Sequence, residues 1–184
     1  MACKLTYCLA HLVIISLVYV EVTSKCRKVP EEKPDFKKLS GTWYIIQTDD
    51  STELSRSCVK YNFVYSTTKK AEVITAYRIL GNETQKKFIA TLSNGQAKVA
   101  PLANDGTYAS NWMDLKIPYA DYDQYYSVYG CDPKSNNSGF VYVGVRNKSL
   151  EDCYIKIMTE RWEKLDFDTN KIFSINQQNC PETN

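Results

Sequence analysis

The sequence is nearly without histidine, has no excess of charge of one sign, and has no apolar run long enough to span a membrane. It has 184 residues, 23 Lys+Arg against 21 Asp+Glu, a net charge of +2 and one histidine, His11. Nucleic-acid backbones require strongly basic surfaces, so this balance argues against a nucleic-acid partner. With 43% hydrophobic and 24% charged residues, the chain has the composition of an ordinary globular protein.

The scarcity of histidine excludes several kinds of site at once. Catalytic Ser-His-Asp and Cys-His pairs, His-ligated haem and imidazole-rich zinc sites all require this residue. The sequence also has no CxxC pair, and its cysteine spacings are too wide and irregular for a zinc knuckle. We therefore predict no catalytic residues, no metal site and no enzyme activity.

The first 24 residues have the pattern of a secretory signal peptide. Lys4 supplies a positive charge, Leu9–Val20 is a largely apolar run of twelve residues, and Val22-Thr-Ser24 suits a cleavage site. A membrane anchor needs about 20 apolar residues, and no second apolar stretch or lipid-anchor tail follows. The predicted product is secreted and extracellular, without a transmembrane anchor, and consists of a single domain over residues 25–184.

Secretion determines how the cysteines are interpreted. Two of the seven lie in the predicted signal peptide, which leaves Cys26, Cys58, Cys131, Cys153 and Cys180. Secreted proteins are exposed to oxidising conditions, so an odd number predicts two disulfides and one spare thiol.

The rest of the sequence alternates between apolar and polar residues with the period of β-strands. The 14 tyrosines, with Val, Ile and Thr, favour pleated sheet. Short strands joined by turns predict an all-β antiparallel barrel or sandwich. The eight predicted strands are 42–48, 57–66, 71–80, 86–93, 96–103, 111–118, 122–131 and 139–147.

Two helical segments are predicted. Asp35-Phe-Lys-Lys-Leu39 can form one turn before Ser40-Gly41 ends it. Near the C-terminus, Ser149 is the predicted N-cap of a helix whose apolar stripe packs on the outside of the sheet. The residues at helical spacing are Leu150, Tyr154, Ile157, Arg161 and Leu165.

Three ordered motifs resemble those of lipocalins. Gly41-Thr-Trp43-Tyr44 opens the first predicted strand, Ala120-Asp121-Tyr122 lies between the sixth and seventh, and Arg146 ends the eighth. Ala120 departs from the family's usual Thr. Cys58-Val-Lys-Tyr61 and Asn176-Gln-Gln-Asn179-Cys180 are similar to the apolipoprotein D-like and insect bilin-binding-protein branch of arthropod lipocalins. The resemblance implies an eight-stranded antiparallel up-and-down β-barrel with one C-terminal α-helix packed outside.

The resemblance also implies roles for individual residues. It pairs Cys26 with Cys131 and Cys58 with Cys180, which leaves Cys153 as a free thiol; we expect it to pack under the helix, with a covalent-ligand site or a homodimer link as alternatives. Trp43 and Arg146 are expected to meet at the closed end of the barrel as a structural pair. The other structural motif residues are Gly41, Asp121 and Tyr122.

The resemblance further implies a cavity inside the barrel that binds one small molecule. Tyrosine presents an apolar ring with a polar tip, which suits a bilin, retinoid, sterol or fatty acid. Core packing without a ligand is the alternative for each lining residue. No cofactor is obligatory, although a bilin or lipid can be bound. The predicted cavity residues are Tyr61, Phe63, Met113, Leu115, Tyr126, Val128, Phe140 and Tyr142.

A second function also follows from the resemblance. Some secreted lipocalins of blood-feeding arthropods inhibit a host protein or scavenge a small amine mediator. The polar segment 49–57 and the Tyr-rich segment 119–129 are the predicted surfaces for an extracellular protein target. Sequons at Asn82, Asn136 and Asn147 predict N-glycosylation. A glycan is least expected at Asn147, because this residue lies beside Arg146 and the start of the predicted helix.

Overall fold

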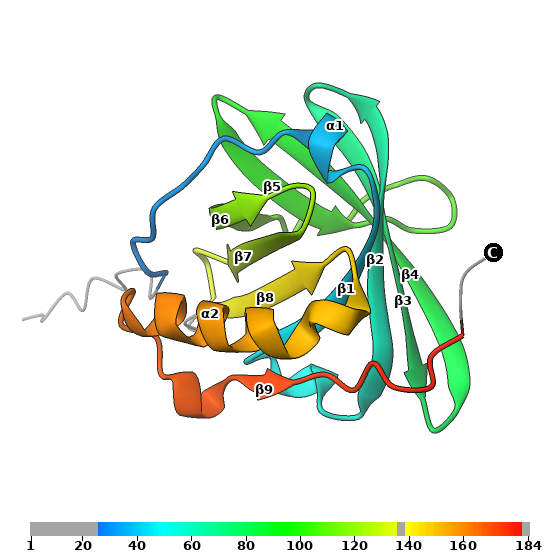
Figure 1. Ribbon diagram of the computed structural model, residues 1–184. Helices are drawn as coiled ribbons and strands as arrows, with labels where there is room; N and C mark the ends of the chain where they lie inside the picture. The colour runs from blue at the N-terminus through cyan, green and yellow to red at the C-terminus, as the bar shows by residue number, and fades with distance from the viewer. Residues whose placement is uncertain (1–25, 136–138, 182–184) are drawn as a thin grey trace, which may run out of the picture.

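The computed structural model describes residues 26–135 and 139–181 (Figure 1). The predicted signal peptide 1–24 and the sequon residue Asn136 lie outside the described residues. Within those ranges, one antiparallel sheet has the strand order β2-β3-β4-β5-β6-β7-β8-β1-β9, and β1 also pairs with β2. This additional pairing closes eight strands into a barrel, which confirms the predicted fold; β9 is an extra strand outside the barrel.

The strands begin and end close to the predicted positions. The strand predicted at 86–93 begins earlier, and those predicted from 111 and 122 begin slightly later. The observed bounds are β1 Gly41–Thr48, β2 Arg56–Thr67, β3 Lys70–Ile79, β4 Asn82–Ser93, β5 Gln96–Pro101, β6 Met113–Asp121, β7 Tyr125–Cys131, β8 Phe140–Val145 and β9 Phe173–Ser174.

The short helix α1, Phe36–Leu39, forms where the sequence predicts it. The Asp35 carboxylate accepts hydrogen bonds from the backbone N–H groups of Lys37 and Lys38, at 3.0 and 3.1 Å. These bonds satisfy donors that the helix itself leaves unpaired. Phe36 and Leu39 are buried, so α1 covers one end of the barrel.

The C-terminal helix differs from the prediction in two details. A 3-10 turn, η2 Lys148–Leu150, precedes α2, Glu151–Glu163. Ser149 therefore does not cap α2; instead Asn147 Oδ1 accepts from the Ser149 backbone N–H at 2.9 Å. Within the described residues, no helix is both long and apolar enough to cross a membrane.

The buried face of α2 is centred one residue further along than predicted. Tyr154, Met158 and Trp162 are buried, whereas Ile157 and Arg161 are only partly buried. Met158 and Trp162 did not belong to the predicted stripe. They pack, with Ile46 and the outward-facing valines of β8, into a cluster between α2 and the barrel wall. Figure 1 shows α2 running alongside β8 and β1.

The β1 strand is buried on both faces because it lies between this outer cluster and the barrel interior. Ile45 belongs to the interior cluster and Ile46 to the outer one. The β1–β8 register shifts between Ile45 and Gln47. The wall beneath α2 is thus apolar on both sides, as a helix-covered strand requires.

Both predicted disulfides are present. Cys26–Cys131 and Cys58–Cys180 have Cα–Cα distances of 5.8 and 5.4 Å. Cys153 is unpaired, as predicted, but it is exposed on α2. The expectation that its thiol packs under the helix is therefore wrong, because the buried face begins at the neighbouring Tyr154.

The C-terminal segment is attached to the barrel by Gln177. Its Nε2 donates to the carbonyl oxygens of Ile45 and Val59, at 2.7 and 2.9 Å, and the side chain is buried. Next to it, the Cys58 N–H donates to the Asn176 carbonyl. The Asn176–Cys180 segment therefore adds backbone pairing and a disulfide at the same place. Before it lie η3 Thr169–Lys171 and β9.

Candidate ligand cavity

The closed end of the barrel, under α1, is formed around Trp43 and Arg146. The guanidinium carbon of Arg146 lies 3.7 Å from the centre of the Trp43 ring system, which is fully buried. Trp43 Nε1 donates to the Leu39 carbonyl at 2.7 Å. A desolvated cation–π contact of this kind is strong. The predicted contact is confirmed and ties β1 to the end of β8.

Arg146 also joins the segments that meet at this end. Its Nη2 donates to the carbonyls of Lys38 and Ser40, at 2.9 and 2.8 Å, and its Nη1 donates to the Thr42 carbonyl at 3.1 Å. Gly41 has φ +96°, and a Cβ there would lie 3.1 Å from Nη1. The glycine of the first motif therefore leaves room for the arginine of the third.

The second motif forms the turn beside this pair. The Asp121 carboxylate accepts from the Asp123 N–H at 3.2 Å and from the Gln124 amide at 3.1 Å. The Tyr122 carbonyl accepts from Arg146 Nε, and the Tyr122 hydroxyl accepts from the Asp35 N–H. The three motifs are thus linked at this end, and all but one of these hydrogen bonds involve a backbone group, as expected of structural residues.

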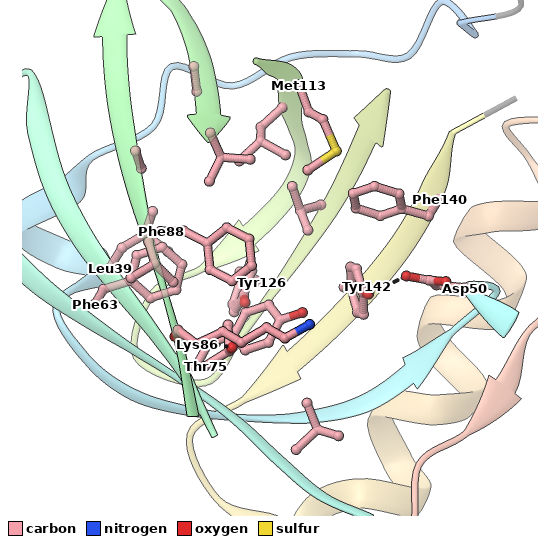
Figure 2. A pocket seen from close by; sticks show the side chains of 18 of the residues that line it. Leu39, Asp50, Phe63, Thr75, Lys86, Phe88, Met113, Tyr126, Phe140 and Tyr142 are labelled. Atoms are coloured by element: carbon pink, nitrogen blue, oxygen red, sulfur yellow. Dashed lines mark hydrogen bonds between the residues drawn. The ribbon is translucent and has the colours of Figure 1, made fainter. Parts of the chain in front are cut away.

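The barrel encloses a cavity of about 320 Å³ that reaches from this end to the loops of the open end. All eight predicted cavity residues line it, because the period-two alternation places them on the inward faces of their strands. Figure 2 shows how several of them gather around it. The sequence prediction included Tyr61, Phe63, Met113, Leu115, Tyr126, Val128, Phe140 and Tyr142.

Aromatic rings form much of the wall. Phe140 and Tyr142 have ring centroids 5.2 Å apart, Tyr61 and Tyr142 5.7 Å, and Phe63 and Tyr126 6.0 Å. Tyr126 also meets Trp43 at 4.8 Å in an edge-to-face contact. Such contacts hold each ring in one orientation. The cavity therefore has a largely fixed, apolar and aromatic surface.

The open end of the cavity contains acidic side chains that the sequence analysis did not place there. The 3-10 turn η1, Ser51–Glu53, follows Asp50, whose carboxylate accepts from the Thr52 N–H at 3.0 Å. Asp50 and Glu53 both line the cavity, and Glu53 is only 3% exposed. The sequence holds a signal for this turn that was not used in the prediction: the Asp-x-x-Glu spacing of a capping box, Asp50 to Glu53.

Tyr142 connects these carboxylates to the cavity wall. Its hydroxyl donates to Asp50 Oδ2 at 2.8 Å and lies 3.3 Å from Glu53 Oε1 (Figure 2). The neighbouring Asp49 accepts from the Val141 N–H at 2.7 Å, so the same loop also holds the start of β8. Within the segment 49–57, predicted as an outer surface, Asp50 and Glu53 thus face the cavity, while Ser51, Leu54 and Ser55 stay exposed.

Glu53 forms an ion pair with Arg56, whose guanidinium also lies 4.1 Å from the centre of the Tyr77 ring. Burial raises the pKa of the Glu53 carboxyl, and the nearby Arg56 opposes that shift. Burial likewise raises the pKa of Asp49, against its hydrogen bond from Val141. The ionised form of each of these buried carboxyls is therefore stabilised only by the few hydrogen-bond donors and the cation beside it.

Several buried polar atoms at the cavity have no hydrogen-bond partner among the described residues. They are Glu53 Oε2, Arg56 Nε and Tyr126 Oη. Burial raises the pKa of Tyr126 well above its ordinary value, so its hydroxyl stays neutral. Unpaired buried polar atoms are uncommon and costly in folded proteins.

The remaining predicted features lie elsewhere. Cys153 does not line the cavity, and the described residues contain no group of three or more side chains suited to hold a metal ion. The segment 119–129 runs from β6 through a turn into β7, and Tyr126 and Tyr129 within it are buried. It therefore offers less outer surface than its tyrosine content suggested.

Comparison with known proteins agrees with the closed barrel and its C-terminal helix. No protein-family model matches the sequence, and no curated protein matches it. Several solved structures do share the architecture, among them arthropod lipocalins. The fold of this chain is therefore the lipocalin fold.

Three of these structures illustrate the similarity. Insecticyanin of the tobacco hornworm Manduca sexta has a TM-score of 0.67 at 15% identity, covering 84% of this chain and 87% of that one. H1 crustacyanin of the lobster Homarus americanus has a TM-score of 0.64 at 18% sequence identity, and the match covers 86% of this chain and 91% of that one. A biogenic amine-binding protein has a TM-score of 0.59 at 19% sequence identity, and the match covers 80% of this chain and 85% of that one. At these identities the similarity establishes the fold.

Proposed function

We propose that this chain is a secreted lipocalin that binds and carries a small hydrophobic ligand in its barrel cavity, without chemistry of its own. The observation that carries the proposal is an aromatic-lined cavity of about 320 Å³ inside the barrel, open at one end, with unpaired polar atoms on residues that line it. Binding would be driven by burial of the ligand's apolar surface, with a few polar groups setting its orientation.

The cavity favours some of the predicted ligand classes over others. Its volume of about 320 Å³ is near the lower end for ligand pockets. A tetrapyrrole such as a bilin is the largest candidate and would need the loops to move apart. A fatty-acid carboxylate would meet Asp50 and Glu53 at the open end. A compact retinoid or sterol-like molecule with a neutral polar group avoids both difficulties.

Other parts of the proposal rest on sequence and general chemistry. The two disulfides support secretion, because such bonds persist mainly in oxidising compartments. Asn82 and Asn147 are exposed and so are suited to carry glycans. A homodimer and an extracellular protein target stay predictions.

The carrier function can be tested by filling the cavity. Ala97 is buried and lines the cavity, so Ala97→Phe should occupy ligand space. We expect the wild-type protein to bind retinol, biliverdin or a fatty acid saturably, near one ligand per chain, and Ala97→Phe to lose at least tenfold in affinity, about 1.4 kcal/mol. Tryptophan fluorescence quenching and native mass spectrometry measure this.

The matched control adds the same ring outside the barrel. Ser66 is exposed on β2 near the closed end, and Ser66→Phe should leave the affinity unchanged. Circular dichroism establishes that both variants are folded. Equal binding by the wild type and a folded Ala97→Phe would place the ligand outside the cavity and contradict the proposal.

A second candidate, binding of a small amine, is favoured by the carboxylates at the cavity. Asp50 and Glu53 line it together with aromatic rings, and an ammonium group is attracted to both kinds of side chain. One structurally similar protein is named for binding biogenic amines.

Tyramine distinguishes this candidate from the carrier. If the amine candidate is correct, Glu53→Gln should weaken tyramine binding by about tenfold or more, because it removes a buried charge partner. Glu72→Gln removes a carboxylate that pairs with Lys87 in a more solvent-exposed position and serves as the control. If tyramine does not bind while retinol does, the amine candidate is wrong.

A further inference from the structure

The charged side chains that line the cavity have partners, with one exception. Asp50 accepts from the Tyr142 hydroxyl, and Glu53 forms an ion pair with Arg56. Lys86 also lines the cavity, but its ammonium group has no ion pair or hydrogen bond within the described part of the chain. An ammonium group has three donors and no acceptor, so Lys86 is left able to bind a hydrogen-bond acceptor.

The β4 strand directs Lys86 into the barrel. Lys86, Phe88 and Ala90 alternate along β4 and all line the cavity. Figure 2 shows the Lys86 side chain extending from the strand into this space. The next residue, Lys87, belongs to the opposite face of β4, and its ammonium lies 3.6 Å from Glu72 Oε1. Of these two adjacent lysines, only the inward one is left without a protein partner.

Lys86 lies where the cavity wall meets solvent. β5 pairs with β4 only from Phe88 onward, and Lys86 precedes this pairing and is exposed. Its charge is therefore partly hydrated, whereas Phe88 and Ala90 continue the cavity wall toward the closed end. An amphipathic ligand can place its polar head at Lys86 and bury its apolar part along this wall.

The carboxylates of the cavity come from a different part of the wall. Asp50 and Glu53 belong to the segment between β1 and β2, whereas Lys86 is on β4, with β3 between β2 and β4. Neighbouring strands are about 4.8 Å apart, so two such spacings separate β2 from β4. A ligand carboxylate would be repelled beside Asp50 and Glu53 and attracted beside Lys86. An acidic ligand therefore suits this cavity in one orientation.

We propose that Lys86 binds the head group of the ligand and that the cavity prefers a compact hydrophobic acid over the corresponding alcohol. This inference rests on the proposed function of the cavity and specifies the head group of its ligand. A carboxylate and an ammonium form a charge-assisted hydrogen bond, which is stronger than the bond to a neutral hydroxyl. Because Lys86 is exposed, water screens this attraction, and the expected preference is modest.

Retinoic acid and retinol test this because they share one carbon skeleton and differ in the head group. Each can be titrated into the full chain and followed by quenching of tryptophan fluorescence. We expect the wild type to bind retinoic acid about fivefold more tightly than retinol. Lys86→Gln should bring this ratio to one or below, mainly by weakening retinoic acid. Lys86→Arg should keep the preference, because it keeps the positive charge.

Lys87→Gln is the matched control. It removes the same charge from the adjacent residue, which pairs with Glu72 and does not line the cavity, so the preference for retinoic acid should persist. Retinol binding with a ratio of one or below in the wild type, or a ratio lost equally in both glutamine variants, would overturn the inference while the carrier function stands. Failure of both retinoids to bind would also overturn it, and failure of biliverdin and a fatty acid as well would overturn the carrier function too.

Discussion

The two ends of the barrel use polar groups in opposite ways. At the closed end, Arg146 donates to four backbone carbonyls and covers the buried Trp43 ring. At the open end, buried Glu53 and Arg56 each retain an unpaired polar atom beside the cavity. The hydrogen bonds of Arg146 to backbone carbonyls make it a structural residue of the closed end, whereas the unpaired atoms of Glu53 and Arg56 leave capacity for a ligand. The comparison separates residues that hold the fold from residues available for recognition.

Truncating Trp43 should have the largest effect on stability. Trp43→Ala should lower the free energy of unfolding by about 3–5 kcal/mol, because it opens a large cavity in a fully buried site. Trp112→Ala removes a partly buried tryptophan and should cost about 1 kcal/mol. Denaturant unfolding followed by circular dichroism compares them. Similar losses in the two variants would mean that the Trp43–Arg146 pair contributes little.

The disulfides should have the next largest effect. They close sequence separations of 105 and 122 residues, so the loop-entropy argument predicts nearly equal losses, each about 2–4 kcal/mol. The double variants Cys26→Ser/Cys131→Ser and Cys58→Ser/Cys180→Ser test this by thermal unfolding. A much larger loss for the second pair would show that the hydrogen bonds of Gln177 depend on that bridge.

Acidification should affect the open end of the barrel, where Glu53 is buried. Burial raises the pKa of Glu53, so folding favours its protonated form, and its ionisation reduces stability as pH rises from the ordinary value through the raised one. An ammonium ligand needs the ionised form. If the amine candidate is correct, lowering the pH through the raised pKa of Glu53 should weaken tyramine binding while the Glu53 contribution to stability increases.

The groups facing Glu53 define the control for this pH experiment. Asp50, Arg56 and Tyr142 each influence the Glu53 carboxyl, and Asp49 also has a raised pKa. Glu53→Gln should flatten much of the pH dependence of tyramine affinity, measured by calorimetry. An unchanged profile in this variant would contradict the role of Glu53 and leave Asp49, whose pKa is also raised by burial, as the group responsible.

The smallest effect is expected on α2. Cys153 is exposed, so Cys153→Ser should change the free energy of unfolding by less than about 0.5 kcal/mol. Met158→Ala, on the buried face of the same helix, should cost about 2–5 kcal/mol. Iodoacetamide should label Cys153 in the native protein. Slow labelling that accelerates only on unfolding would contradict its exposed position.

Much of the fold and of the cavity wall was predictable because both follow from local periodicity. Strand alternation placed Tyr61, Leu115 and Phe140 on inward faces, and they line the cavity. The helix was harder to predict. Its buried face depends on how α2 lies against β8 and β1, so Met158 and Trp162 were missed while Arg161 was included.

By itself, the sequence determined the eight strands, the cysteine pairing implied by family resemblance and the meeting of Trp43 with Arg146. These features follow from short-range patterns and from motifs at characteristic positions. The tertiary structure alone decided that Asp50 and Glu53 face the cavity and that the Tyr142 hydroxyl donates to Asp50. A polar segment between two strands is usually solvated. Burial of its carboxylates depends on partners about 90 residues away in sequence, such as Tyr142, and local patterns do not encode such pairings.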